Sequence, residues 1–92
     1  YECEYPKNQA LKMIMSGKDA TVLIDSLKGK IDKPFHLFLK GYNNKDNDTL
    51  IDSALEFLQL GDSFLANFPK HEAVKNGFNE SLMNKMLKLR AH

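Results

Sequence analysis

The chain has 92 residues, of which 42% are hydrophobic and 27% are charged, and its formal net charge is +1. This length accommodates one hydrophobic core, and the composition is typical of a folded globular domain rather than of a disordered segment. The near-neutral balance creates no global field that would favour nucleic acid or a membrane surface as the partner. We therefore expect a single domain over residues 1–92, with a frayed N-terminus over residues 1–5 and no nucleic-acid partner.

The apolar residues recur at intervals of three or four through most of the chain, which predicts an all-α fold. A first helix is expected over residues 6–16, because Pro6 is tolerated in a first turn and Gly17 can end the helix in the left-handed conformation. A second helix is expected over residues 20–28, with the carboxylate of Asp19 as its N-cap.

A third helix is expected to begin at Pro34 and to end at Gly41. One side of it is aromatic, and consists of Phe35, Phe38 and Tyr42. The residues that follow, 41–48, are rich in Asn and Asp, whose side chains bond to nearby backbone and favour turns. The sequence therefore predicts the most prominent loop of the domain at this point.

The longest predicted helix covers residues 49–67 and is apolar around more than half of its circumference. Such a helix must be buried on several sides, so we expect it at the centre of a compact bundle of four to five short helices. Gly61 lies within its apolar face, where the missing Cβ would permit a close approach of a neighbouring helix. The alternative is a break at residues 61–63 with a second helix after it. Pro69 is expected to end the helix, and a last helix is expected over residues 80–91.

Residues suited to catalysis or to metal binding do not form a recognisable motif. His36, His71 and His92 lie in three separate segments without a pair four positions apart, so the spacing of a zinc site is missing. A glycine-rich phosphate loop is missing as well. The sequence predicts a protein that is not an enzyme and uses no cofactor.

The N-terminal region bears on compartment and on oligomeric state. The sequence opens at Tyr1, which is expected either after removal of a signal peptide, in a secreted or periplasmic protein, or within a longer protein. Cys3 is the only cysteine, so it either joins two chains, as a homodimer in an oxidising compartment, or is a free thiol without a task. Asn47 and Asn79 lie in glycosylation acceptors, which matter only in a secreted eukaryotic protein. No apolar run approaches the ~20 residues that span a bilayer.

Charge is distributed unevenly along the chain. Residues 42–63 contain five carboxylates and one lysine, whereas residues 70–92 contain five basic residues and two carboxylates. Either pole could dock a partner protein and raise its association rate. Alternatively, both are solvated helix faces, because the helix dipole favours carboxylates near the start of a helix and cations near its end. The residues predicted to bind a partner are Asp46, Asp48, Asp52, Glu56, Lys85, Lys88 and Arg90.

All four methionines lie in the first and last predicted helices, at Met13, Met15, Met83 and Met86. Methionine adapts to irregular apolar ligands, so these residues would line an apolar groove if the two helices lay side by side. Ordinary core packing is the other interpretation. The function predicted from the sequence is a small helical protein-binding module, such as a secreted inhibitor, effector or immunity-type protein. A carrier of a lipid or another apolar ligand is the alternative.

Overall fold

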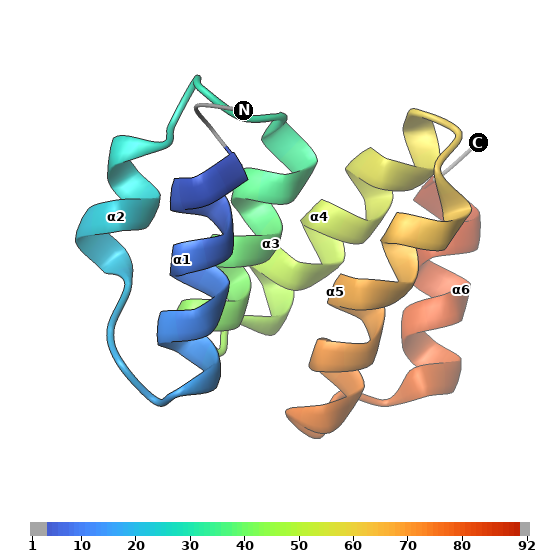
Figure 1. Cartoon of the computed structure of the whole chain (residues 1–92). Helices are drawn as coiled ribbons and strands as arrows, with labels where there is room; N and C mark the ends of the chain where they lie inside the picture. Colours follow the sequence, from blue (N-terminus) through green and yellow to red (C-terminus); the bar gives the residue numbers. More distant parts are fainter. Residues whose placement is uncertain (1–3, 91–92) are drawn as a thin grey trace.

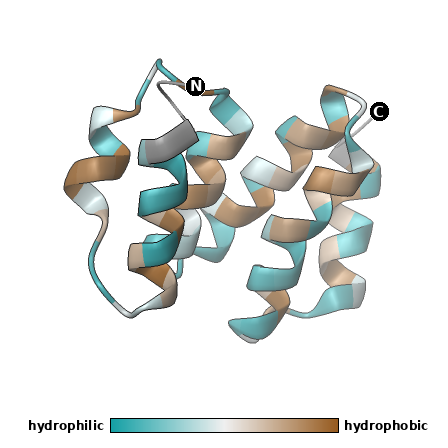
Figure 2. Cartoon of the chain, in the orientation of Figure 1, coloured by the Kyte–Doolittle hydropathy of each residue, from teal (hydrophilic) through white to brown (hydrophobic). Residues whose placement is uncertain are grey.

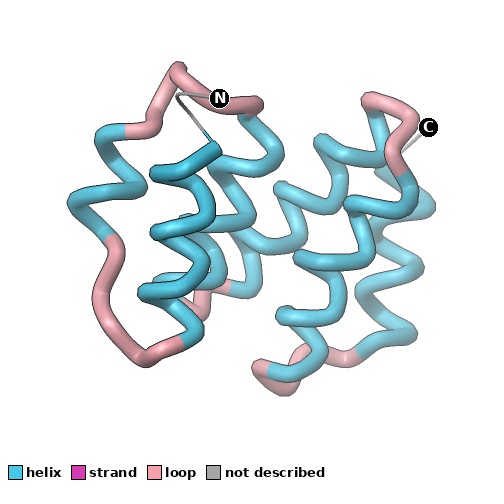
Figure 3. Tube along the Cα trace, viewed as in Figure 1, coloured by secondary structure: helices cyan, strands magenta, loops and turns pink. Residues whose placement is uncertain are grey.

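The computed structural model describes residues 4–90, and within that range it consists of six α-helices and no strand (Figure 1). The all-α bundle expected from the sequence is confirmed, with six helices instead of four to five. Connections of a few residues join successive helices (Figure 3). The helices are α1 (Glu4–Met15), α2 (Thr21–Ser26), α3 (Lys33–Asn44), α4 (Asn47–Gln59), α5 (Ser63–Lys75) and α6 (Glu80–Arg90).

The chain reverses direction at each connection, so neighbouring helices lie antiparallel (Figure 1). Helix α4 packs most extensively, against α3 on one side and α5 on the other. Helices α1 and α2 pack on α3, whereas α6 packs on α4. The two terminal helices therefore lie in different parts of the fold, with α3, α4 and α5 between them. None of the helices in the described range has both the length and the apolar character of a membrane span.

The buried apolar side chains form two clusters, and the hydropathy colouring of Figure 2 shows the apolar positions on the helix faces that meet. Leu11 and Phe35 pack against both clusters and so connect them. The larger cluster consists of Phe38, Leu50, Ile51, Ala54, Ala73, Met83 and Leu87. The smaller one consists of Ala10, Ala20, Ile24, Leu27 and Leu39.

The helix predicted over residues 49–67 is interrupted, and the break at residues 61–63 that the sequence left open is confirmed. Gly61 has a φ of +81°, a conformation that glycine adopts without steric cost, and it lies in the turn that ends α4. Asp62 then caps α5, because its carboxylate accepts a hydrogen bond of 2.9 Å from the Leu65 amide. The predictions of one continuous central helix and of a close helix contact at Gly61 are therefore wrong.

Gly41 takes the role that the sequence assigned to Gly61. It does not end α3, which continues to Asn44, and it is buried where α3 crosses α4. A Cβ added at Gly41 would lie 2.8 Å from Leu50 Cγ and 2.9 Å from the Leu50 amide nitrogen. The missing side chain thus allows the two helices to approach closely. Because both helices extend into the predicted loop over residues 41–48, only two residues connect them.

Pro69 does not end a helix either. It lies inside α5, where it removes one backbone hydrogen bond and opposes regular helix geometry. Its ring is less than 2% exposed, so burial of that ring offsets part of the cost. Of the segment expected to fray, residues 4 and 5 belong to α1. Residues 1–3, and with them Cys3, lie outside the described residues.

Candidate functional site

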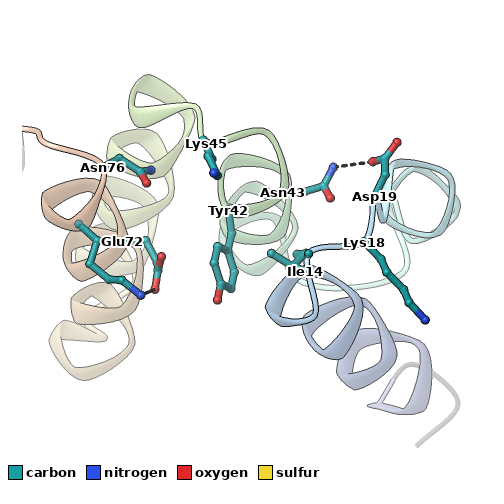
Figure 4. Close-up of a pocket in the computed structure, with 10 residues that line it drawn as sticks. Ile14, Lys18, Asp19, Tyr42, Asn43, Lys45, Glu72 and Asn76 are labelled. Carbon is teal, nitrogen blue, oxygen red and sulfur yellow. Dashed lines mark hydrogen bonds and ion pairs between the residues drawn. The ribbon is translucent and has the colours of Figure 1, made fainter.

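A cleft of about 530 Å³ opens between α1 and α5, with α3 beneath it (Figure 4). Figure 4 shows the Tyr42 ring pointing from α3 into the space between these helices, with Ile14 of α1 and Glu72 of α5 on either side. The residues that line the cleft are Ile14, Gly17, Lys18, Asp19, Tyr42, Asn43, Lys45, Glu72, Lys75 and Asn76. Its surface therefore combines one aromatic ring with charged and amide groups.

A row of aromatic rings extends from this cleft along α3 and α5. Phe38 stacks on Tyr42 with 5.6 Å between ring centroids, and Phe68 of α5 lies 6.5 Å from Phe38. Phe64 follows at 5.7 Å from Phe68, and Phe35 lies edge-on to Phe38 at 5.9 Å. Phe64 is 71% exposed and Phe68 is 48% exposed. We call the cleft together with these five rings the α3/α5 face.

The ionisable groups of the cleft are arranged on opposite sides of Tyr42. Burial, and secondly the negative charge of Glu72, raises the pKa of the Tyr42 hydroxyl. The hydroxyl is therefore protonated at neutral pH and can donate a hydrogen bond. The Glu72 side chain is mostly buried and forms an ion pair of 3.9 Å with Lys75.

Lys45 is the first residue after α3 and has a φ of +53°. Each of the four other described residues with a left-handed φ is a glycine, as expected for a conformation that crowds a Cβ. The Lys45 side chain has no hydrogen-bond or ion-pair partner among the described residues. In Figure 4 it extends from the α3–α4 turn toward the cleft, whereas Lys18 points away from it.

A hydrogen-bond network fixes the end of the cleft formed by the α1–α2 loop. The Ala20 amide donates to Asn43 Oδ1 at 2.9 Å, and Asn43 Nδ2 donates to Asp19 Oδ1 at 3.2 Å and to Thr21 Oγ1 at 3.1 Å. Hydrogen bonds from the Thr21 hydroxyl and amide, and then from Asn43, lower the pKa of Asp19. Asp19 itself lies one residue before the N-cap, Ala20.

The acidic residues predicted to bind a partner gather on α4 and do not line the cleft. Asp46 is the N-cap of α4, where its carboxylate accepts hydrogen bonds from the Asp48 and Thr49 amides. Asp48, Asp52 and Glu56 follow at intervals of four, and Glu56 pairs with Lys33 at 3.1 Å. Their arrangement is that of an ordinary solvated helix face. Whether it binds a partner stays a prediction.

The basic residues of the same prediction belong to α6. Lys85 and Lys88 are exposed there, and neither lines the cleft. The side chain of Arg90 lies outside the described part of the structure. His36 and His71 belong to different helices, α3 and α5. His36 Nε2 donates a hydrogen bond of 3.1 Å to the Ile24 carbonyl, and His92 is not among the described residues.

The methionine groove is not formed, because α3, α4 and α5 separate α1 from α6 (Figure 1). Met13 packs against the smaller core cluster, whereas Met83 and Met86 belong to or pack against the larger one. Met15 is 73% exposed. Core packing thus describes Met83, and Met13 and Met86 in part, but not Met15.

The α3/α5 face was not predicted from the sequence, because residues 49–67 were expected to form one helix without the break at Gly61. Once that break is known, the spacing is informative. Phe64 and Phe68 lie four residues apart on a helix whose buried residues are Ala66, Pro69 and Ala73, so the two rings belong to another side.

Comparison with known proteins supplies a family and no close relative. A family model described as AimR transcriptional regulator-like matches residues 1–75, from the N-terminus to the end of α5. No curated protein and no solved structure matches the chain. The match lends no support to secretion or to lipid transport, and the prediction that nucleic acid is not a partner is not confirmed. This family model matches most of the chain and nearly all of the α3/α5 face, so the chain belongs to the AimR transcriptional regulator-like family.

Proposed function

We propose that this chain is a non-catalytic helical regulatory domain that binds an extended peptide segment on the α3/α5 face. The observation that carries the proposal is the exposed pair Phe64 and Phe68, which continues through Phe38 to Tyr42 in the cleft. Exposed apolar patches next to a few polar groups are typical of binding sites. A regulator acts by binding, so such a face is a feature that the family membership leads us to expect.

The spacing of the rings favours a peptide over a rigid small ligand. Neighbouring centroids along the row from Phe64 to Tyr42 are 5.6–6.5 Å apart. In an extended peptide, alternate side chains point to the same side and are about 6.6 Å apart. Successive residues on one side of such a segment can therefore contact Phe64 and Phe68, whereas Phe38 belongs to the buried core and connects these rings to Tyr42. The lysines and carboxylates of the cleft argue against a purely apolar cargo, which would desolvate them without pairing them.

The proposal is tested by selecting peptides against the intact chain. We expect a displayed library of random seven-residue peptides to yield binders, and Phe64→Ala and Phe68→Ala to weaken their binding about tenfold or more. Both side chains are exposed, so the variants should keep the far-UV circular dichroism of the wild type. Val22→Ala and Leu89→Ala are matched controls, because these apolar side chains are 85% and 79% exposed but do not belong to the α3/α5 face. They should leave the affinity unchanged.

Two results would contradict the proposal. One is a selection that enriches no peptide, and the other is a set of peptides whose affinity is the same for wild type, Phe64→Ala and Phe68→Ala. A gel-shift experiment with random double-stranded DNA tests the remaining prediction about nucleic acid. We expect no shift at physiological ionic strength, because the net charge of +1 gives little counterion release.

A further inference from the structure

Lys45 is an unusual residue for its position. The turns after α1, α2, α4 and α5 each contain a glycine with a φ between +78° and +95°, so glycine is the common solution of this chain for a helix end. Only the turn after α3 uses a lysine, although a Cβ is crowded in that conformation. A cation near a helix C-terminus is favourable, but a lysine within the last turn of α3 would provide it without a left-handed backbone. Local stability therefore does not explain why position 45 is a lysine.

The surroundings of Lys45 show what its ammonium group is available for. It lines the cleft, and no carboxylate among the described residues pairs with it. Both carboxylates that line the cleft are already engaged, Glu72 with Lys75 and Asp19 with Thr21 and Asn43. Tyr42 lines the same cleft, and in Figure 4 its hydroxyl lies at the end of the ring away from Lys45. Lys45 is thus a cation that extends toward the cleft without a paired carboxylate among the described residues, next to the apolar row.

We infer that Lys45 binds a carboxylate of the peptide segment that occupies the α3/α5 face. This inference rests on the proposed function and adds a direction to it. Apolar side chains would lie on the exposed rings of Phe64 and Phe68, and the carboxylate would lie at the cleft end. The carboxylate is either the C-terminus of the segment or an acidic side chain, since both present the same two oxygens to an ammonium group.

The test uses three synthetic probes that differ only in the last residue or in its terminal group. They are the N-acetylated tripeptide Phe-Leu-Phe with a free carboxylate, the same tripeptide as an amide, and N-acetyl-Phe-Leu-Glu amide. Each is titrated into the isotope-labelled full chain and followed by the NMR signals of Lys45, Tyr42, Phe64 and Phe68. We expect one or both carboxylate probes to bind about tenfold more tightly than the uncharged amide. The probe that shows the preference identifies the source of the carboxylate.

The variant Lys45→Gly removes the ammonium group and places at this position the residue that the backbone favours. We expect its melting temperature to equal or exceed that of the wild type, while the preference for a carboxylate falls to less than about twofold. Lys45→Arg should restore the preference, because it keeps the charge. Lys18→Gln is the matched control and should keep the wild-type preference, because Lys18 lines the same cleft but points away from it.

The outcomes separate the two proposals. If the amide binds at the phenylalanine rings as tightly as the two carboxylate probes, the proposed function stands and the role of Lys45 is refuted. The same holds if Lys45→Gly keeps the preference. If none of the three probes shifts the signals of Phe64 and Phe68, the role of Lys45 is refuted, and the peptide selection alone decides the proposed function.

Discussion

Replacement of Gly41 by alanine tests whether the α3–α4 crossing is as tight as the structure indicates. The new Cβ would lie 2.9 Å from the Leu50 amide nitrogen, which is about 0.5 Å closer than ordinary van der Waals contact. A side chain can escape such a contact by rotation, but a backbone atom of a packed helix cannot. The two helices would therefore have to separate, and the larger core cluster between them would lose contacts.

Two opposing effects set the size of the change. Alanine is favoured over glycine in a helix interior by about 1 kcal/mol, so an unhindered Gly41→Ala would stabilise the protein. Overpacking of a well-filled core costs about 1–3 kcal/mol, with the upper part of that range more appropriate where the obstacle is backbone. We expect a net loss of about 1–2 kcal/mol in the free energy of unfolding, and the transition midpoint in urea should fall by about 1 M.

The assay is urea denaturation followed by circular dichroism, with Gly61→Ala and Gly61→Asn as controls. Nothing lies within 4 Å of a Cβ added at Gly61, so Gly61→Ala should lose stability only through its φ of +81°. Gly61→Asn should recover part of that loss, because asparagine tolerates the left-handed region better than alanine does. A Gly41→Ala protein as stable as the wild type, or more stable, would show that α3 and α4 are not in close contact at this point.

Three further changes follow from single features of the fold, and each is measured by urea or thermal denaturation. Ser53→Ala removes a buried hydrogen bond of 2.7 Å to the Pro34 carbonyl and should cost about 1 kcal/mol, and an unchanged midpoint would contradict that role. Asp46→Ala removes the N-cap of α4 and should cost about 1 kcal/mol at pH 7. Hydrogen bonds, first from the Thr49 hydroxyl, lower the pKa of Asp46, so its contribution is present above pH 3.8 and is lost as the pH falls through the lower folded-state value; Asp46→Ala should remove this acid dependence. Pro69→Ala restores a helical amide, worth about 3 kcal/mol in propensity, and loses about 2 kcal/mol of buried ring, so the melting temperature should rise by roughly 5 °C. A lower melting temperature would mean that packing of the ring outweighs helix propensity.

The sequence predicted the helices well because their signals are local. Periodicity and capping residues located the elements that became α1, α2 and α6, and the start of α3, within a few residues. The glycines were harder to interpret, since a glycine within a helical pattern serves either a turn or a close contact. Gly41 and Gly61 exchanged these roles, because the outcome depends on whether another helix crosses at that position. That information is tertiary and is not contained in the neighbouring residues.

The α3/α5 face could be predicted only in part, for a related reason. The aromatic side of α3 was evident from Phe35, Phe38 and Tyr42, but the sequence indicated burial for the whole side. Its extension by Phe64 and Phe68 requires α5 to lie beside α3, which follows from the break at Gly61. The uneven charge instead led to the prediction that residues of α4 and α6 bind a partner. Those charges are partly explained by capping at Asp46 and by the pair between Glu56 and Lys33.

The crossing at Gly41 and the cleft are parts of one structural unit. The Gly41 carbonyl accepts a hydrogen bond of 2.9 Å from the Asp46 amide, and the Lys45 amide also bonds to the end of α3. The residue whose missing side chain admits α4 is therefore also the anchor of the left-handed turn that holds Lys45. Gly41→Ala should consequently weaken stability and carboxylate binding together, because it displaces α4 and the turn at once. Lys45→Gly should separate the two properties, since it retains the turn and removes only the charged side chain.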